Sequence, residues 1–501
     1  MKTILLLFDS LTSKSLSCYG GAYPTPNFDR LAARSLKFNK HIVGSMPCMP
    51  ARRDLQTGRL NFFHRSWGPL EPFDITATSL MRGAGIHSHL ITDHYHYFEN
   101  GGSTYHTAFD SWEFVRGQEA DPWAAAINPP HKLFAGTYHT DQIDKDLSGY
   151  RLQAAMNRLN INKAAEFPSI KTFDSGLSFL KAHARDDNWF LQIEVFDPHE
   201  PFHAPKEYRE RFPQVDSKIR DWPRYQRGKP EEDTTDLIMS QTALVSMCDD
   251  QVGRLLDLFD TENLWKDTAL IVTTDHGFML GEHGWWGKNR MPFYSEVANI
   301  PLFIYSPGQP IGTTNILSQN IDVMATLLDL HKIEKPETVL GQTLLDGASG
   351  RDFALFGIFG GALNATDGHY SYFRYPSNME TLPLFEYTLM PQHARTPFSV
   401  SELSEAELHP GFDFTLGMPV LKMPALKDAK RPPMQGGGFD DTETVLFDLL
   451  ADPGQMTPFR DEKIEEYFCL AMENILTAHD APIELYKRFD LEVPNESSSF
   501  S

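Results

Sequence analysis

Short apolar runs recur along this chain, and a polar cluster follows each of them. The clearest runs cover residues 4–8, 89–92, 189–196 and 269–274. Runs of this length that alternate with helical stretches are typical of buried strands in a mostly parallel sheet. We therefore expect an α/β fold, in which a large, mostly parallel sheet is sandwiched by helices.

The polar residues behind these runs are acids and histidines. They are Asp9, Asp93, His94, His96, Asp197, His199, Asp275 and His276. In parallel α/β sheets, ligands and chemistry collect at the carboxyl ends of the strands. We expect these side chains to converge on one edge of the sheet.

Helical spacing of apolar residues predicts helices over residues 240–259 and 319–330. Near the end of the chain, residues 444–449 read as a strand and residues 461–476 as a closing helix. The sequence therefore predicts a smaller set of strands and helices that follows the main sheet.

Residues 377–440 break the pattern, because they combine many prolines and a Gly436-Gly437-Gly438 run with little periodicity. We expect a long loop excursion there. This gives a predicted catalytic α/β domain over residues 1–365 and a C-terminal α+β subdomain over residues 366–501, which includes the loop.

Length and charge narrow the class of protein. A chain of 501 residues with 41% hydrophobic content can bury a large core, which excludes disorder. A formal net charge of −22 argues against a nucleic-acid partner and against an anionic membrane surface.

The four cysteines, Cys18, Cys48, Cys248 and Cys469, show no paired spacing for zinc or a disulfide framework, which fits a reducing compartment. The N-terminal apolar run is short, lacks a cleavage site and leads straight into Asp9, so it reads as a strand and not as a signal peptide. No stretch approaches the ~20 apolar residues of a membrane span. We expect a cytoplasmic protein.

The most informative segment is residues 45–59, where Cys48-Met49-Pro50-Ala51-Arg52 is followed by Thr57-Gly58-Arg59. Pro50 suits the first turn of a helix, and Gly58 suits its end. Cys48 is therefore predicted at a helix N-terminus, where free N–H groups favour an anion such as a thiolate.

This string resembles the signature of the type I, formylglycine-dependent sulfatases of the alkaline phosphatase superfamily. Residues 24–32, 321–328 and 446–453 resemble other family segments, so the likeness spans most of the chain, although residues 377–440 match none. It implies that a formylglycine-generating enzyme converts Cys48 to formylglycine. The expected reaction is hydrolysis of an aryl or carbohydrate sulfate ester.

The resemblance also implies roles for single residues. The catalytic set is Cys48, Arg52, His199 and Lys288, and the metal ligands are Asp9, Cys48, Asp275 and His276. Lys288 is expected to hold a sulfate oxygen, His199 to donate a proton, and Arg52 to hold the formylglycine oxygen and neighbouring carboxylates. We expect one divalent metal ion, Ca²⁺ first, with Mn²⁺ or Zn²⁺ as the alternatives.

Two positions depart from the family pattern. Ser10 follows Asp9 where most sulfatases carry a second acid, and Asp93 stands where a lysine is usual, with His94 or His96 as its substrate-binding replacement. A single acid together with His276 also occurs in relatives that cleave phosphonate monoesters and phosphodiesters. That activity is one alternative, and an inactive protein that binds an anionic glycan and keeps Cys48 unmodified is the other.

Overall fold

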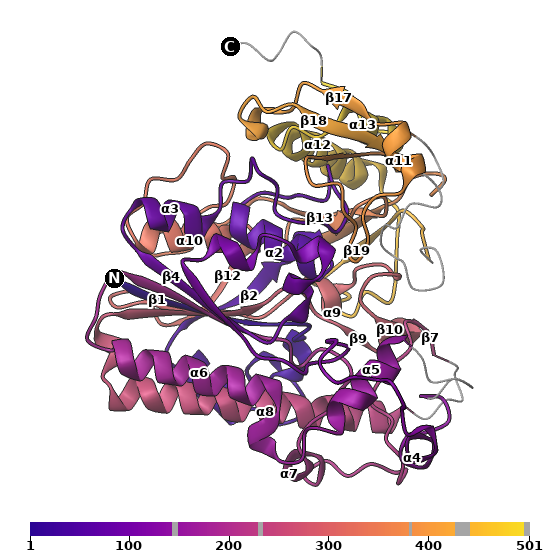
Figure 1. The fold of residues 1–501 in the computed structure, drawn as a ribbon. Helices are drawn as coiled ribbons and strands as arrows, with labels where there is room; N and C mark the ends of the chain where they lie inside the picture. Colours follow the sequence, from indigo (N-terminus) through magenta and orange to yellow (C-terminus); the bar gives the residue numbers. More distant parts are fainter. Residues whose placement is uncertain (143–148, 229–233, 380–382, 426–440, 495–501) are drawn as a thin grey trace.

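The computed structural model describes residues 1–142, 149–228, 234–379, 383–425 and 441–494. An eight-stranded sheet forms its centre (Figure 1). The strand order is β12 (Gly312–Gln319), β2 (Leu36–Ile42), β11 (Leu302–Tyr305), β8 (Thr268–Thr274), β1 (Lys2–Phe8), β6 (Trp189–Val195), β4 (His87–Thr92) and β5 (Ser111–Phe114). Within this sheet β11 alone runs antiparallel to its neighbours.

Side chains alternate between the two faces of the sheet, and helices cover both (Figure 1). Ile4 and Leu6 of β1 pack in the core with α6 (Pro168–His183) and α8 (Thr235–Thr261). Leu5 and Leu7 pack with α2 (Cys48–Thr57), α3 (Ala77–Gly83) and α10 (Asp322–Leu330). The predicted α/β sandwich is confirmed.

The periodic segments of the sequence form the predicted elements. The four apolar runs become β1, β4, β6 and β8, and the predicted helices become α8 and α10. Near the C-terminus the predicted strand is β19 (Val445–Asp448), and the closing helix is α12 (Glu462–Ala478).

A second sheet connects the C-terminal part to the candidate nucleophile. Its order is β19, β15 (Tyr370–Arg374), β14 (Leu363–Thr366), β13 (Ala354–Ile358) and β3 (Ser45–Met46). Residues of α12 and α13 (Ile483–Arg488) pack in its core. Because β3 lies directly before Cys48 and pairs with β13, this sheet fixes the approach of the chain to α2.

Residues 377–440 differ from the expected long loop. Their described part forms a three-stranded antiparallel sheet of β16 (Phe385–Thr388), β18 (Val420–Pro424) and β17 (Glu407–His409), with helix α11 (Val400–Ser404). Tyr387, Phe414 and Val420 form its small core with Phe73. The triple-glycine run lies outside the described residues.

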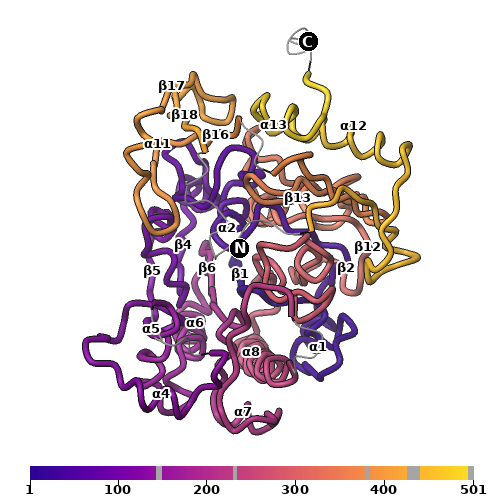
Figure 2. The backbone as a smooth tube through the Cα atoms, turned by 90° about the vertical axis from the view of Figure 1, so that its right-hand side faces the viewer, coloured from indigo at the N-terminus to yellow at the C-terminus, as the bar shows by residue number. Residues whose placement is uncertain are grey.

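The remaining elements surround the main sheet. They are α1 (Pro26–Ala32), α4 (His131–Thr137), α5 (Gly149–Arg158), α7 (Lys206–Arg209), α9 (Ser295–Ala298), β7 (Gln226–Arg227), β9 (Met279–Leu280) and β10 (Trp285–Gly287). Figure 2 shows α12 and α13 at one end of the molecule and α4 and α7 at the other. Among the described helices, none combines the length and apolarity needed to span a bilayer.

Candidate active site

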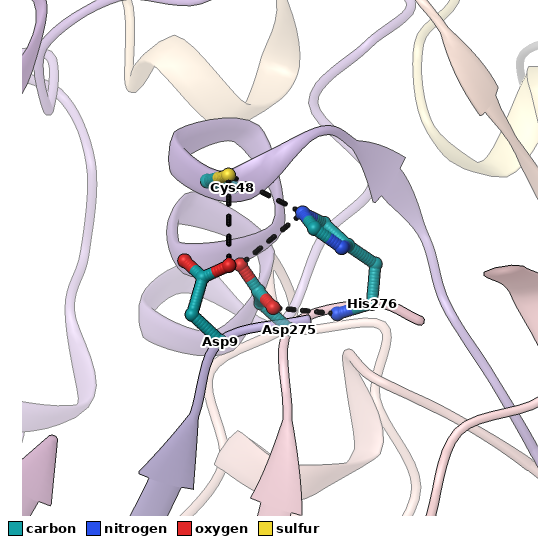
Figure 3. Close-up of side chains that lie close together, drawn as sticks. All are labelled: Asp9, Cys48, Asp275 and His276. Carbon is teal, nitrogen blue, oxygen red and sulfur yellow. Dashed lines mark hydrogen bonds and ion pairs between the residues drawn. The ribbon is translucent and has the colours of Figure 1, made fainter. Parts of the chain in front are cut away.

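The acids and histidines do converge at the carboxyl edge of the main sheet. Asp9 follows β1 and Asp275 follows β8, which pair in parallel up to Phe8 and Thr274. Cys48 begins α2 above these strand ends (Figure 3). Asp9, Cys48, Asp275 and His276 each offer one ligand atom, and these atoms lie within 4.8 Å of one another.

Cys48 is buried, with 2% of its surface exposed. Its Sγ lies 3.2 Å from His276 Nε2 and 4.0 Å from Asp9 Oδ1. Burial and the nearby charge of Asp9 raise the pKa of the thiol well above its usual value. The predicted place at the helix N-terminus is confirmed, but the surroundings keep the encoded cysteine a neutral thiol instead of a thiolate.

Arg52 lies one turn further along α2 and binds three carboxylates. Its Nη2 donates to Asp9 at 3.0 Å and its Nη1 to Asp275 at 2.6 Å. Its Nε donates to Glu194 of β6 at 2.6 Å. One buried guanidinium therefore fixes acids from three strands around the start of the helix.

Asp9 stays ionised although it is fully buried. Burial alone would raise the pKa of this carboxyl group, but the charges of Lys288 and Arg52 hold it well below its ordinary value. A hydrogen bond from His94, whose Nε2 lies 3.2 Å from Asp9 Oδ2, acts in the same direction.

Lys288 reaches Asp9 through Ser10. Its Nζ donates to Ser10 Oγ at 3.0 Å, and Ser10 Oγ donates to Asp9 Oδ1 at 2.7 Å. Burial would lower the pKa of Lys288, but the carboxyl groups of Glu200, Asp9 and Asp275 raise it, so the side chain stays an ammonium ion. Ser10 adopts a left-handed backbone, with φ of 62°.

His199 lies beyond the end of β6 with its Nε2 4.0 Å from Asp9 Oδ1. Its Nδ1 donates to the carbonyl oxygen of Glu200. Since a carbonyl only accepts, Nδ1 carries the proton, and a neutral ring leaves Nε2 as an acceptor. Burial and the charge of Lys288 lower the pKa of His199 well below its usual value, so the ring is neutral in the free site.

The two candidate substrate-binding histidines occupy different places. His94 is fully buried against Asp9. His96 lines a cavity of about 800 Å³, and its Nδ1 lies 2.6 Å from Glu99 Oε2. Cys48, His199 and Lys288 also line this cavity, which places a ligand in it next to the predicted catalytic groups.

The donor cluster fits a divalent metal ion. Asp9 and Asp275 supply carboxylate oxygens, His276 supplies an imidazole nitrogen, and residue 48 supplies the fourth position. Calcium takes six to eight oxygen ligands, whereas an imidazole beside carboxylates also suits manganese or zinc.

Sequence reasoning missed three residues that shape the site. Glu194 binds Arg52 and accepts a hydrogen bond from Tyr97 at 2.7 Å, and Tyr225 donates to Glu200. Glu194 had a signal, since it is a charged residue inside the apolar run 189–196. No local sequence pattern indicates Tyr97 or Tyr225, because their partners come from distant segments.

Comparison with known proteins finds matches over most of this chain. A family model described as Sulfatase matches residues 2–333, and one described as N-sulphoglucosamine sulphohydrolase, C-terminal, matches residues 281–387. The N-acetylglucosamine-6-O-sulfatase of Bacteroides thetaiotaomicron is 25% identical over 406 residues, which cover 68% of this chain and 69% of that protein.

Two solved structures share the fold. One is a complex with its substrate D-glucosamine-2-N,6-O-disulfate, with a TM-score of 0.64, 17% identity and coverage of 96% of this chain and 98% of that one. The other is the phosphonate monoester hydrolase of Agrobacterium radiobacter, with a TM-score of 0.62, 18% identity and coverage of 96% and 95%.

Proposed function

The chain belongs to the sulfatase family and is a sulfuric ester hydrolase, and from that premise we propose that its nucleophile is formylglycine derived from Cys48. The observation that carries this proposal is the position of Cys48 at the start of α2, inside the cluster of Asp9, Asp275 and His276. A buried thiol with a raised pKa is a weak nucleophile. A hydrated aldehyde at this position offers an oxygen nucleophile instead, and making it requires a formylglycine-generating enzyme as partner.

In this proposal the neighbouring side chains bind the ester and move protons. Lys288, an ammonium ion facing the cavity, binds the sulfuryl oxygens. Arg52 holds Asp9 and Asp275 in place. His199 gives a proton to the leaving oxygen, after the bound anion has raised the pKa of its ring.

We propose Mn²⁺ or Zn²⁺ for the metal site in place of the calcium expected from the sequence. Ser10 replaces a second acid, so only Asp9 and Asp275 supply carboxylates, while His276 supplies nitrogen. The ion would add positive charge beside the sulfuryl oxygens and residue 48.

A carbohydrate sulfate is the proposed substrate class. The cavity is large enough for a sugar, and Trp67, Tyr150 and Trp222 line it with aromatic surface. The relative from Bacteroides thetaiotaomicron is an N-acetylglucosamine-6-O-sulfatase, and the substrate in the solved complex is a sulfated glucosamine.

Ser10 and His276 favour a second candidate, a phosphonate monoester or phosphodiester hydrolase with the same nucleophile. The likeness in fold to a phosphonate monoester hydrolase is compatible with it. An inactive glycan-binding protein is the third reading, and it requires Cys48 to remain unmodified.

Mass spectrometry and kinetics together test the proposal. The chain would be produced with a formylglycine-generating enzyme, and the peptide that contains Cys48 would be analysed for the aldehyde. We expect formylglycine, and faster turnover of 4-nitrophenyl sulfate than of a phenyl phosphonate ester. Cys48→Ala should remove both activities. A faster phosphonate rate would establish the second candidate, and an unmodified, inactive enzyme would establish the third.

A further inference from the structure

The cavity above Cys48 is rich in cationic side chains, although the whole chain is strongly acidic. The basic residues that line it are Arg151, Arg224, Lys288, Arg290 and Arg395, and the described acids that line it are Glu119 and Glu200. Burial raises the pKa of Glu200 to about 7, which reduces its negative charge at neutral pH. A net charge of −22 makes such a concentration of arginines a specific feature of this cavity.

Arg395 differs from the other arginines of the cavity because it lies on a segment, here called the arm, that packs against the rest of the protein. This arm, residues 389–398, follows β16 and lies outside both segments matched by family models. Buried Arg65 holds the arm by donating from Nη2 to the carbonyls of Met390 and Gln392, each at 2.8 Å. The amide of Gly101 donates to the carbonyl of Ala394 at 2.9 Å, and a Cβ at Gly101 would lie 2.6 Å from Ala394 Cα.

The guanidinium of Arg395 is held in a fixed orientation on the cavity wall. Its Nε donates to Glu99 Oε1 at 2.5 Å, and its Nη2 donates to Tyr95 at 3.2 Å. It also lies 4.1 Å from the ring centroid of Tyr150. Within the described residues no hydrogen bond uses Nη1, and 37% of the side chain is exposed.

Glu99 links this arginine to the substrate side of the site. Its second oxygen, Oε2, binds His96, which also lines the cavity. One carboxylate therefore positions an arginine and a histidine side by side. Lys288 and His199 line the cavity together with Cys48, where the ester is proposed to react, so neither Arg395 nor His96 is needed there.

We propose that Arg395 is a specificity-determining residue that binds a second anionic group of the substrate, either a carboxylate or a second sulfate, beside His96. The inference rests on the proposed function and narrows it to glycan sulfates that carry at least two acidic groups. Arginine suits this task because its planar set of donors matches the oxygens of both groups. Glu99 is a positioning residue that acts through Arg395 and His96.

Calorimetry on a Cys48→Ala background tests the proposal without any need for turnover. Three disaccharide ligands would be compared: one with a single sulfate, one with two sulfates, and one with a single sulfate and a uronate carboxylate. We expect the better of the two doubly acidic ligands to bind at least about tenfold tighter than the singly sulfated one, as a charge-assisted hydrogen bond predicts. Which of them binds tighter identifies the group.

Adding Arg395→Ala should reduce this preference to less than about threefold. Arg395→Lys keeps the positive charge but loses the planar set of donors, so it should retain a part of the preference for doubly acidic ligands. Arg254→Ala is the matched control, because Arg254 is 42% exposed and pairs with Asp174 at 2.5 Å, away from the cavity. It should keep the full preference.

Three results would overturn the inference: no preference for a second acidic group, an unchanged preference in Arg395→Ala, or no binding of any of the three ligands. Failure of the proposed function would look different. It would be an absence of aryl sulfate turnover by the enzyme that carries formylglycine, while the binding preference of the Cys48→Ala protein persisted.

Discussion

Among single residues, Arg52 is the cation that binds three carboxylates of the site. It is 1% exposed and neutralises Asp9, Asp275 and Glu194, which are themselves fully buried. Buried carboxylates without a partner are costly, so the helix that presents residue 48 also stabilises the acids around it. The candidate metal ligands and the candidate nucleophile are thus held in place by the same side chain.

We expect Asp275→Asn to lower metal content and activity together, because a divalent ion depends on carboxylate charge. Asp74→Asn is the control, since the Asp74 side chain is only 5% exposed and pairs with Arg53 at 2.7 Å outside the cluster. Elemental analysis of the purified variants measures the ion. Full occupancy in Asp275→Asn would remove this residue from the ligand set.

The leaving group separates His199 from Lys288. A proton donor matters most when the departing oxygen is strongly basic, so His199→Ala should slow a sugar sulfate by about 10²–10⁴-fold and 4-nitrophenyl sulfate far less. Lys288→Ala should slow both, because the sulfuryl oxygens need a cation whatever leaves. Comparison of kcat/KM for the two substrates shows which residue donates the proton. Equal losses on both substrates in His199→Ala would assign the role of proton donor to Lys288.

Most of the candidate site could be predicted from the sequence because its residues occupy strand ends or a recognisable motif. Asp9, Asp275 and His276 follow apolar runs, and Cys48 opens the helix that its prolines and Gly58 predict. Arg395 could not be predicted, because a fold of distant segments brings it to the cavity.

Among the elements, helix α2 requires a glycine at its C-terminal end. Gly58 closes it with φ of 62°, and a Cβ there would lie 2.6 Å from Val339 Cγ1. Gly58→Ala should therefore destabilise the protein by about 1–3 kcal/mol, through both backbone strain and overpacking.

Gly83→Ala is the control for this change. Gly83 is the last residue of α3, and a Cβ added there would meet open space within 4 Å among the described residues, so alanine should be neutral or slightly stabilising. Thermal unfolding of both variants makes the comparison. Equal melting temperatures would show that the end of α2 tolerates a side chain.

Elements with long periodic runs were predictable, whereas the sheet of β16, β17 and β18 was not. Its strands have three to five residues, and prolines interrupt the stretches between them. Short strands of this kind gain their stability from long-range pairing and from contacts such as Phe73 with Phe414, which local pattern does not reveal.

For the molecule as a whole, a buried ionic network joins the catalytic region to this small sheet. Arg65 lies 3.2 Å from Glu71 and 3.1 Å from Glu386 of β16. Arg65→Met keeps the volume but leaves two buried acids without their cation, so we expect a loss of about 3–5 kcal/mol in unfolding free energy.

Urea unfolding measures this loss, with Arg82→Met as the comparison. Arg82 is 50% exposed and pairs with Asp110, so its replacement should cost less than about 1 kcal/mol. If Arg65→Met proved as mild as Arg82→Met, the small sheet would be attached by its apolar contacts alone.

The burial of α2 limits the time during which Cys48 is accessible to another enzyme. Every residue from Cys48 to Thr57 is buried, and the second sheet closes over the chain just before it. If Cys48 is converted as proposed, an enzyme that binds the segment around it as an extended peptide must act on the nascent chain, before β3 pairs with β13. We then expect folding speed to limit the modified fraction: slower synthesis or a cooler host should raise that fraction, and a molecule that folds first should keep an unmodified Cys48.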